Sequence, residues 1–436
     1  MHTLLSTAGI VLVAVLSSSV ARAERPPNVV LIISDDQAWT DYGFMGHEVI
    51  QTPRLDQLAR ESAVFTRGYV PTSLCRPSLM TMITGMYPFQ HRVTGNDPAR
   101  GPGAWDRALL LSRVQSLPTI PRLLGQHGYV SFQSGKWWEG NYRLGGFTAG
   151  MTHGDPKRGG RHGDLGLTIG RQGLQPIFDF LQQADGKPFF LWYAPFLPHR
   201  PHNPPERLLK KYAVPGRSEQ VAKYYAMCQW FDETCGELLD YLAAHNLREN
   251  TLVVYVCDNG WIQLPDHGGY APRSKRSPYE GGIRTPILLR WPGHIRPHRD
   301  EATLVHTIDL APTILAACGV ETPKAMPGEN LLPVCNGQPL QRSAIFGDVY
   351  AHDMAERNNP LASLRYRWCI AGDWKLIDDA RTGERELYNL ADDPTEQTDL
   401  AQANPATVER LEERLQAWWA SMGGNKKAQS AGPEVK

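Results

Sequence analysis

The sequence has no excess of charge of either sign. Its 45 Lys and Arg residues equal its 45 Asp and Glu residues, whereas proteins that bind nucleic acid or anionic membranes usually carry a basic excess. Nothing in the composition therefore indicates a nucleic-acid partner. Local charge can still suit an anionic substrate, because a balanced total says nothing about how the charges are distributed.

The sequence also has no apolar run that would span a bilayer comfortably. The run "LLSTAGIVLVAVL" near the N-terminus is too short, and "SSSVARA" after it resembles a signal-peptidase site that ends at Ala23. We therefore predict a signal peptide over residues 1–23. The mature chain is expected to be exported, periplasmic or secreted, with no membrane insertion. An uncleaved anchor is the alternative, since the charged segment that should precede the run is only "MH".

Cysteine is scarce, with seven residues in the chain. An exported compartment allows disulfides, but Cys228 and Cys235 lie in one predicted amphipathic helix, "VAKYYAMCQWFDETCGELLDYLAAH". Seven residues of helix rise about 10.5 Å, too far for those two to pair. The sequence leaves the other pairings open.

Short apolar runs alternate with helical segments along most of the chain, and there are no internal repeats. "NVVLIIS", "PFFLWYA", "TLVVYVC" and "PILLRW" are typical of buried parallel strands, so we predict a large α/β domain over 24–340. The glycine-rich stretch 141–173 is expected to form loops near a site. Antiparallel strands and a helix are predicted for a smaller subdomain over 341–422, followed by a disordered tail over 423–436.

Acidic and amide side chains follow two of the predicted strands. Asp35 and Asp36 come directly after the first strand, and Asp258 and Asn259 follow "TLVVYVC". Ligands of open α/β sheets bind outside the carboxyl ends of the strands, and an all-oxygen set suits calcium or magnesium. Each pair alone could merely cap a helix or turn. Two pairs at matched strand ends favour a metal site.

A cysteine in "SLCRPSLMTMITG" conflicts with that interpretation. A thiolate is a soft ligand and does not belong beside a hard cation held by oxygens. Cys75 is therefore either an ordinary buried thiol elsewhere in the fold or a residue converted to an oxygen species after synthesis. The residues alone leave both possibilities open.

The chain resembles the type I sulfatases of the alkaline phosphatase superfamily over nearly all of the mature sequence. The resemblance rests on nine blocks in the same order: "NVVLIISDD", "TPRLDQLARESAVFTRGYV", "CRPS…TG", "GKW", "LPHRP", "DNG", "YEGGIRTPILLRWPG", "DLAPTILAACG" and "ELYNLADDPTEQTDLA". It implies a large, mostly parallel mixed sheet flanked by helices. It also implies a smaller C-terminal subdomain of antiparallel strands with a helix.

The resemblance assigns a metal site and a nucleophile. It implies that a formylglycine-generating enzyme oxidises Cys75, so that a hydrated aldehyde binds calcium in place of the thiol. A metal-bound hydroxyl is easier to deprotonate, which fits that assignment. The implied calcium ligands are the modified Cys75 together with Asp35, Asp36, Asp258 and Asn259.

The resemblance also implies three residues that handle the sulfate. Lys136 in "GKWWEG" matches a lysine that bridges nucleophile and sulfate, and Lys275 matches a second sulfate-binding lysine. His199 in "LPHRP" matches the histidine that contacts the sulfate and protonates the leaving oxygen. Charge-assisted donors of this kind stabilise a tetrahedral anion most where water is excluded.

Two positions depart from the family pattern. Leu79 stands where the family has an arginine that helps hold formylglycine, and Trp138 stands where the family has a histidine that acts as a base. Neither side chain offers a charge or a base. Candidate substitutes in this sequence are Arg76 as a cation and, as bases, His153, His162 and His267.

Three functions are compatible with these departures. The first is hydrolysis of a sulfate ester, plausibly on a sulfated carbohydrate. The second is hydrolysis of phosphate or phosphonate esters, as in other members of the superfamily. The third is binding of sulfated glycans without turnover. The matched metal set, Cys75, both lysines and His199 favour the first, because a site that had lost its chemistry would have no reason to keep them all.

Overall fold

The computed structural model describes residues 25–101, 104–154 and 164–424. An eight-stranded sheet forms the centre, in the order β10-β2-β9-β8-β1-β7-β5-β6. The predicted signal peptide, His162 and nearly all of the predicted tail lie outside the described residues. The strands of this sheet are β1 (Asn28–Ser34), β2 (Ala63–Phe65), β5 (Val130–Gly135), β6 (Ala149–Gly150), β7 (Phe189–Ala194), β8 (Thr251–Cys257), β9 (Ile287–Arg290) and β10 (His298–Asp300).

All four strands predicted from apolar runs are present, and most of the sheet is parallel. β1 pairs in parallel with both β7 and β8, so the two strands followed by acidic side chains are direct neighbours. The expectation that "PILLRW" runs parallel is wrong, because β9 pairs antiparallel with β8 and with β2. A buried antiparallel strand is as apolar as a parallel one, so composition alone did not distinguish the two.

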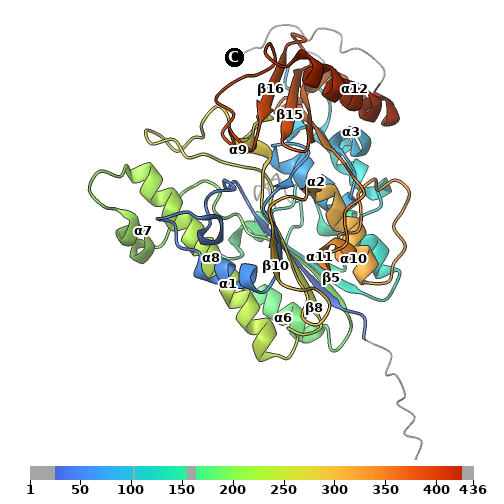
Figure 1. The fold of residues 1–436 in the computed structure, drawn as a ribbon. Coiled ribbons are helices and arrows are strands. Elements are labelled where there is room, and N and C mark those ends of the chain that lie inside the picture. Colours follow the sequence, from blue (N-terminus) through green and yellow to red (C-terminus); the bar gives the residue numbers. More distant parts are fainter. Residues whose placement is uncertain (1–24, 102–103, 155–163, 425–436) are drawn as a thin grey trace, which may run out of the picture.

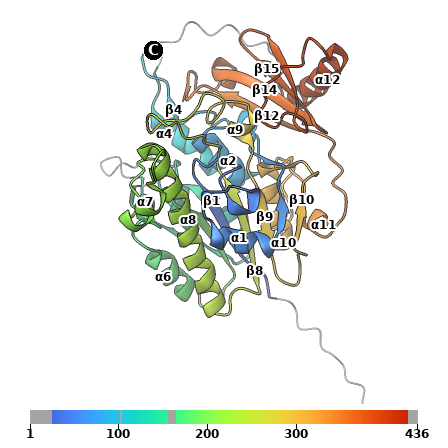
Figure 2. The ribbon, with the colours of Figure 1, turned by 60° about the vertical axis from the view of Figure 1, so that its left-hand side comes forward.

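Helices cover both faces of the large sheet (Figures 1 and 2). Val29, Leu31 and Ile33 of β1 belong to one buried cluster, whereas Val30 and Ile32 belong to another. Successive residues of a strand point to opposite faces, so each face has its own core. The first core includes residues of α2 (Cys75–Thr84), α5 (Ile120–Gly125) and α10 (Leu310–Ala317), and the second those of α1 (Pro53–Arg60), α6 (Gln175–Gln183) and α8 (Glu219–Ala244).

The C-terminal region forms a four-stranded antiparallel sheet with one helix, α12, on its outer side (Figure 1). Trp368 donates from Nε1 to the carbonyl of Pro71 at 3.1 Å and so joins this sheet to the large domain. Lys375 is buried between Glu280 (3.1 Å) and Glu396 (2.7 Å). The predicted fold class is confirmed. The subdomain elements are β12 (Ile345–Tyr350), β14 (Leu364–Ala371), β15 (Trp374–Asp379), β16 (Arg385–Asn389) and α12 (Pro405–Ser421).

Short elements connect these parts. Two-stranded pairs form between β3 and β11 and between β4 and β13, and the second pair ties the C-terminal region to the chain after α3. These elements are β3 (Gly68–Tyr69), β4 (Asp97–Pro98), β11 (Val305–His306), β13 (Asp353–Met354), α3 (Pro88–His91), α4 (Arg107–Leu111), α7 (Glu206–Tyr212), α9 (Glu280–Ile283) and α11 (Leu332–Cys335).

The seven cysteines all lie among the described residues, and none of them forms a disulfide. Cys228 and Cys235 both lie in α8, as predicted, and both are buried. Among the helices of the described ranges, none combines the length and hydropathy needed to cross a membrane.

His306 at the base of the C-terminal subdomain makes stability depend on pH. It is buried, contacts the carbonyl of Phe346 through Nε2 at 3.0 Å, and has a pKa lowered by burial from 6.5 to about 3. Between these values the unfolded chain binds one more proton than the folded chain. The free energy of unfolding therefore falls as pH drops through this window, by up to about 1.4 kcal/mol per pH unit from this residue.

We expect His306→Gln to remove that contribution, because glutamine does not titrate. Urea unfolding between about pH 4 and pH 6 should show a slope of unfolding free energy against pH that is smaller than in the wild type by about the same amount. Identical slopes in the two proteins would contradict this assignment.

Candidate active site

The carboxyl ends of β1 and β8 bring the two predicted acidic pairs together. Asp36 donates from its backbone amide to Oδ1 of Asp258 at 3.1 Å, and Asn259 donates from Nδ2 to Oδ1 of Asp36 at 2.7 Å. The amide of Asp258 donates to the carbonyl of Ser34 at 2.9 Å, which continues the strand pairing into the site. All four residues of the two pairs are buried.

Three oxygens in this group accept no hydrogen bond from any described residue. They are Oδ2 of Asp35, Oδ2 of Asp258 and Oδ1 of Asn259. Buried polar atoms normally have partners, so such atoms require an explanation. Three carboxylates and an amide oxygen form a hard, anionic donor set that fits a calcium ion. The residues present therefore suit the cofactor that the family resemblance implies.

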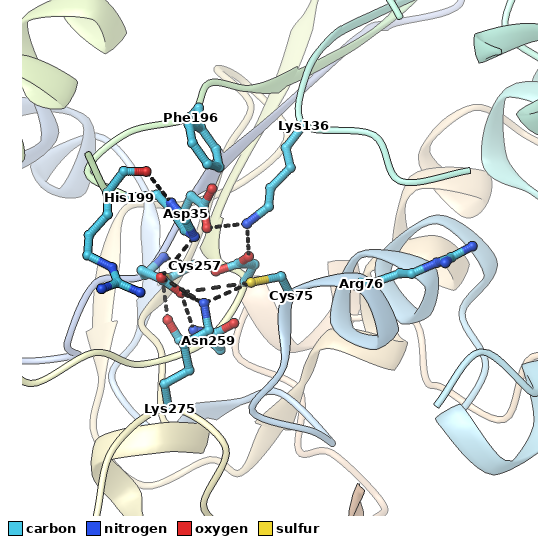
Figure 3. Close-up of polar contacts among 12 residues, drawn as sticks. Asp35, Cys75, Arg76, Lys136, Phe196, His199, Cys257, Asn259 and Lys275 are labelled. Carbon is cyan, nitrogen blue, oxygen red and sulfur yellow. Dashed lines mark hydrogen bonds and ion pairs between the residues drawn. The ribbon is translucent and has the colours of Figure 1, made fainter. Parts of the chain in front are cut away.

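Cys75 is the first residue of α2 and faces the same group (Figure 3). Lys275 reaches its Sγ with Nζ at 2.9 Å and also contacts Oδ1 and Oδ2 of Asp36 at 2.5 and 2.7 Å. Sγ lies 3.9 Å from Oδ1 of Asp36. One ligand atom each from Asp35, Asp36, Cys75 and His199 lie within 4.8 Å of one another. The cysteine is thus part of the oxygen-lined site, not a thiol buried elsewhere.

Lys136 enters the site from the segment after β5, a strand that the sequence analysis did not predict. Gly135 precedes it with a φ of +81°, and a Cβ there would lie 1.9 Å from the carbonyl oxygen of Ala194. Only glycine allows this approach, in which the amide of Lys136 donates to that carbonyl at 2.6 Å. The ammonium reaches Oδ1 of Asp35 at 2.6 Å and lies 3.6 Å from Oδ2 of Asp258.

His199 is less buried than the other residues of the group, with 17% of its side chain exposed. Its ring stacks on Phe196 with centroids 4.1 Å apart, and Nδ1 lies 2.6 Å from the carbonyl oxygen of Arg200. A carbonyl can only accept, so Nδ1 carries the proton of the neutral ring. Nε2, at 3.4 Å from Oδ2 of Asp36, is then the nitrogen that can exchange a proton in the site.

Burial sets the electrostatics of these groups. It raises the pKa of the Cys75 thiol to about 12 and lowers the pKa of His199 well below its usual value. Burial alone would also raise the pKa of Asp36, but the ammonium groups of Lys275 and, to a smaller extent, Lys136 outweigh it and hold that pKa well below its usual value. Burial raises the pKa of Asp35 well above its usual value, even though Lys136 opposes the shift. A bound divalent cation would favour the ionised form of that carboxyl.

Apolar packing surrounds both positions that depart from the family pattern. Leu79 and Trp138 are 4% and 2% exposed and belong to the same core cluster. The expectation that Arg76 substitutes for the missing cation is wrong, since its side chain points away from Cys75 (Figure 3). It forms a two-fold ion pair with Glu139, Nε to Oε1 at 2.7 Å and Nη2 to Oε2 at 2.6 Å.

The histidines suggested as substitute bases lie elsewhere. His153 and His267 are both exposed. His153 contacts Tyr142 and Asp164, and His267 contacts Gly269, none of which belongs to the group around Cys75. His162 lies outside the described residues.

Glu139 is the residue that the sequence analysis missed. Its signal was a pair of opposite charges, Arg76 within the matched block "CRPS" and Glu139 two residues after the matched block "GKW".

We expect Leu79→Arg to destabilise the protein and not to restore the family arrangement. The side chain would enter an apolar cluster, where a charge without a partner costs about 3 kcal/mol or more. Chemical denaturation should show a loss of that size. Leu109→Arg is the control, because Leu109 is 38% exposed and should change stability by about 0.5 kcal/mol at most. Wild-type stability with higher turnover in Leu79→Arg would contradict the expectation.

Comparisons with known proteins converge on one family. The family described as "Sulfatase" matches residues 27–320, and "N-sulphoglucosamine sulphohydrolase, C-terminal" matches residues 266–420. The chain is 30% identical to human N-acetylgalactosamine-6-sulfatase over 366 residues, which cover 74% of this chain and 68% of that protein.

Solved structures share the fold over most of the chain. Ps i-CgsB in complex with k-i-k-neocarrahexaose superposes with a TM-score of 0.74 at 23% identity, covering 93% of this chain and 95% of that one. A protein in complex with its substrate D-glucosamine-2-N,6-O-disulfate also gives a TM-score of 0.74, at 21% identity, covering 93% and 100%. The architecture described above is therefore that of these proteins.

Proposed function

The chain belongs to the sulfatase family of sulfuric ester hydrolases, and on that premise we propose that it removes sulfate from a sulfated carbohydrate with formylglycine at position 75 and calcium as cofactors. The observation that carries the proposal is the convergence of Asp35, Asp36, Asp258, Cys75 and two lysines at one end of the sheet. The carbohydrate substrate class is supported by the names and bound saccharides of the relatives.

Formylglycine and calcium each supply one chemical property. Oxidation of Cys75 by a formylglycine-generating enzyme would place a hydrated aldehyde, an oxygen nucleophile, where the thiol now contacts Lys275. Calcium would be held by Asp35, Asp36, Asp258 and Asn259, and when bound it supplies a divalent charge for anionic oxygens.

The chain's own residues would bind and orient the sulfate. Lys136 and Lys275 already contact site carboxylates at 2.6 and 2.5 Å, and their ammonium groups would be the donors to an anionic sulfate bound beside those carboxylates. Charge-assisted donors that are fixed in a buried site stabilise developing negative charge without reorganisation. This accounts for two buried lysines next to position 75.

His199 would protonate the leaving alcohol oxygen through Nε2 when the sulfur–oxygen bond breaks. The Arg200 carbonyl accepts from Nδ1 and keeps Nε2 directed into the site. Burial favours the neutral ring, whereas an approaching sulfate anion favours the protonated ring. The histidine is therefore placed to take up a proton when substrate binds and to give it to the leaving group.

The decisive experiment measures sulfate release together with the chemical state of Cys75. The protein is produced with a formylglycine-generating enzyme, the tryptic peptide with Cys75 is analysed by mass spectrometry, and sulfated and phosphorylated forms of the same saccharides are compared. We expect the aldehyde in the peptide, sulfate release, and phosphate release slower by about 100-fold or more. Full conversion of Cys75 without sulfate release from any saccharide would overturn the proposal.

We also propose export, which follows from the N-terminal sequence and not from the site. Sequencing of the protein recovered outside the cytoplasm of its expression host should find a mature N-terminus at Glu24. A retained N-terminus at Met1 would instead indicate an uncleaved anchor.

A further inference from the structure

A buried ion pair connects the two segments that carry Cys75 and Lys136. Arg76 directly follows Cys75 in the first turn of α2, and Glu139 lies three residues after Lys136. Their side chains are 0% and 2% exposed and meet through two parallel contacts of 2.7 and 2.6 Å. This ion pair therefore links the segment after β5 to the N-terminus of α2.

The remaining donors of Arg76 also have partners. Nη1 donates to the carbonyl oxygen of Asn96 at 2.9 Å, and the backbone amide of Arg76 donates to Oδ1 of the same residue at 3.3 Å. The planar guanidinium is thus held in one orientation by two different segments. An arginine fork engaged in this way fixes direction as well as distance.

Stability alone does not account for such a pair. Removing two charges from water is costly, and apolar residues of similar volume are often as stabilising as a buried ion pair or more so. Apolar residues already pack at neighbouring positions of this part of the chain. Leu79 lies one helical turn along α2 from Arg76, and Trp138 precedes Glu139. Both are buried in the core. What the ion pair adds is a fixed geometry between two segments.

We propose that Arg76 and Glu139 are positioning residues, which lock the first turn of α2 to the Lys136 segment and so fix the nucleophile at position 75 relative to Lys136. This inference rests on the proposed function. Lys136 and residue 75 lie on different elements, so their separation depends on what joins those elements. A displacement of about 1 Å in a catalytic group can cost about 100-fold in rate.

The test is a double variant, Arg76→Met with Glu139→Leu, which removes the pair without leaving one charge buried alone. Turnover of a sulfated saccharide is divided by the formylglycine content measured by mass spectrometry. We expect a melting temperature close to that of the wild type, a kcat lower by about tenfold to 100-fold, and little change in KM. A kcat within twofold of the wild type would overturn the proposal.

A second measurement does not need turnover. The protein is made without the maturation enzyme, so that Cys75 keeps its thiol. Alkylation of Cys75 by iodoacetamide is then followed on its tryptic peptide. The rate of this reaction reports how often the first turn of α2 opens. We expect at least about a tenfold faster reaction in the double variant, because opening of the turn would no longer be opposed by the pair. If the wild type releases no sulfate, the proposed function fails, but this rate still decides the positioning role.

Arg367→Met is the matched control. Its guanidinium also bonds a buried carboxylate, that of Asp378, but in the C-terminal sheet, and Asp378 keeps a second partner in Arg385 at 2.7 Å. This variant should lose stability and keep both kcat and the alkylation rate within twofold. If the double variant does not fold, Glu139→Gln replaces it, since glutamine keeps the shape and loses the charge. An unchanged kcat and alkylation rate in Glu139→Gln would then overturn the proposal.

Discussion

Cys75→Ala is expected to lower sulfate release by about 10⁴-fold or more, since it removes the atom from which the nucleophile would be made. Alanine leaves the lysines, the carboxylates and His199 in place, so binding of the sulfated saccharide should survive. Turnover is measured with the protein produced alongside a formylglycine-generating enzyme, and saccharide affinity is measured by calorimetry on the same sample.

Cys335→Ala separates this loss from a general effect of removing a buried thiol. Cys335 lies in α11 and is 1% exposed, like Cys75. The control should lose some stability through the cavity it leaves, and should keep kcat within about twofold. Residual activity above about 1% in Cys75→Ala would mean that another group attacks the sulfate.

The convergence of the two acidic pairs was predictable because it follows from a topological rule. Asp35 and Asp258 each come directly after a strong apolar strand, and pairing of β1 with β8 places them at one edge of the sheet. The apolar runs predicted the two strands, and the resemblance to the sulfatase blocks implied that these strands are neighbours in the sheet. The position of Cys75 also followed from the blocks, since it depends on contacts such as the one with Lys275, 200 residues further along the chain.

The surroundings of Cys75 were less predictable, because they depend on the direction in which side chains point. Arg76 looked like a substitute cation because it is next to Cys75 in sequence, yet neighbours on a helix point about 100° apart. Strand β5 was not predicted because "VSFQSG" contains two serines, a glutamine and a glycine. The polar residues of β5 can be buried because they form hydrogen bonds; Ser134, for example, donates to the carbonyl of Trp192 at 2.8 Å. Such partners are distant in sequence, so a local pattern does not predict them.

Removal of calcium should lower turnover about a thousandfold and lower thermal stability at the same time. Without a cation, three buried carboxylates face only two lysines, and a metal typically contributes several kcal/mol to stabilising transition-state charge. Calcium at about 1,000 times its dissociation constant should add about 4 kcal/mol to the free energy of unfolding. Activity and melting temperature are measured after chelation with EGTA and after calcium is added back, and both should recover.

The variant Asp258→Asn tests whether calcium raises activity and melting temperature by binding at this site. The amide keeps the size of the side chain but lacks the charge, so calcium should no longer raise the melting temperature at concentrations that saturate the wild type. Asp240→Asn on the exposed side of α8 is the control, with 69% of its side chain exposed, and its calcium response should match the wild type. Equal calcium responses in all three proteins would place the bound ion elsewhere. The carboxylates would then be neutralised by Lys136 and Lys275 alone, and both lysines would have to leave them before sulfate could bind.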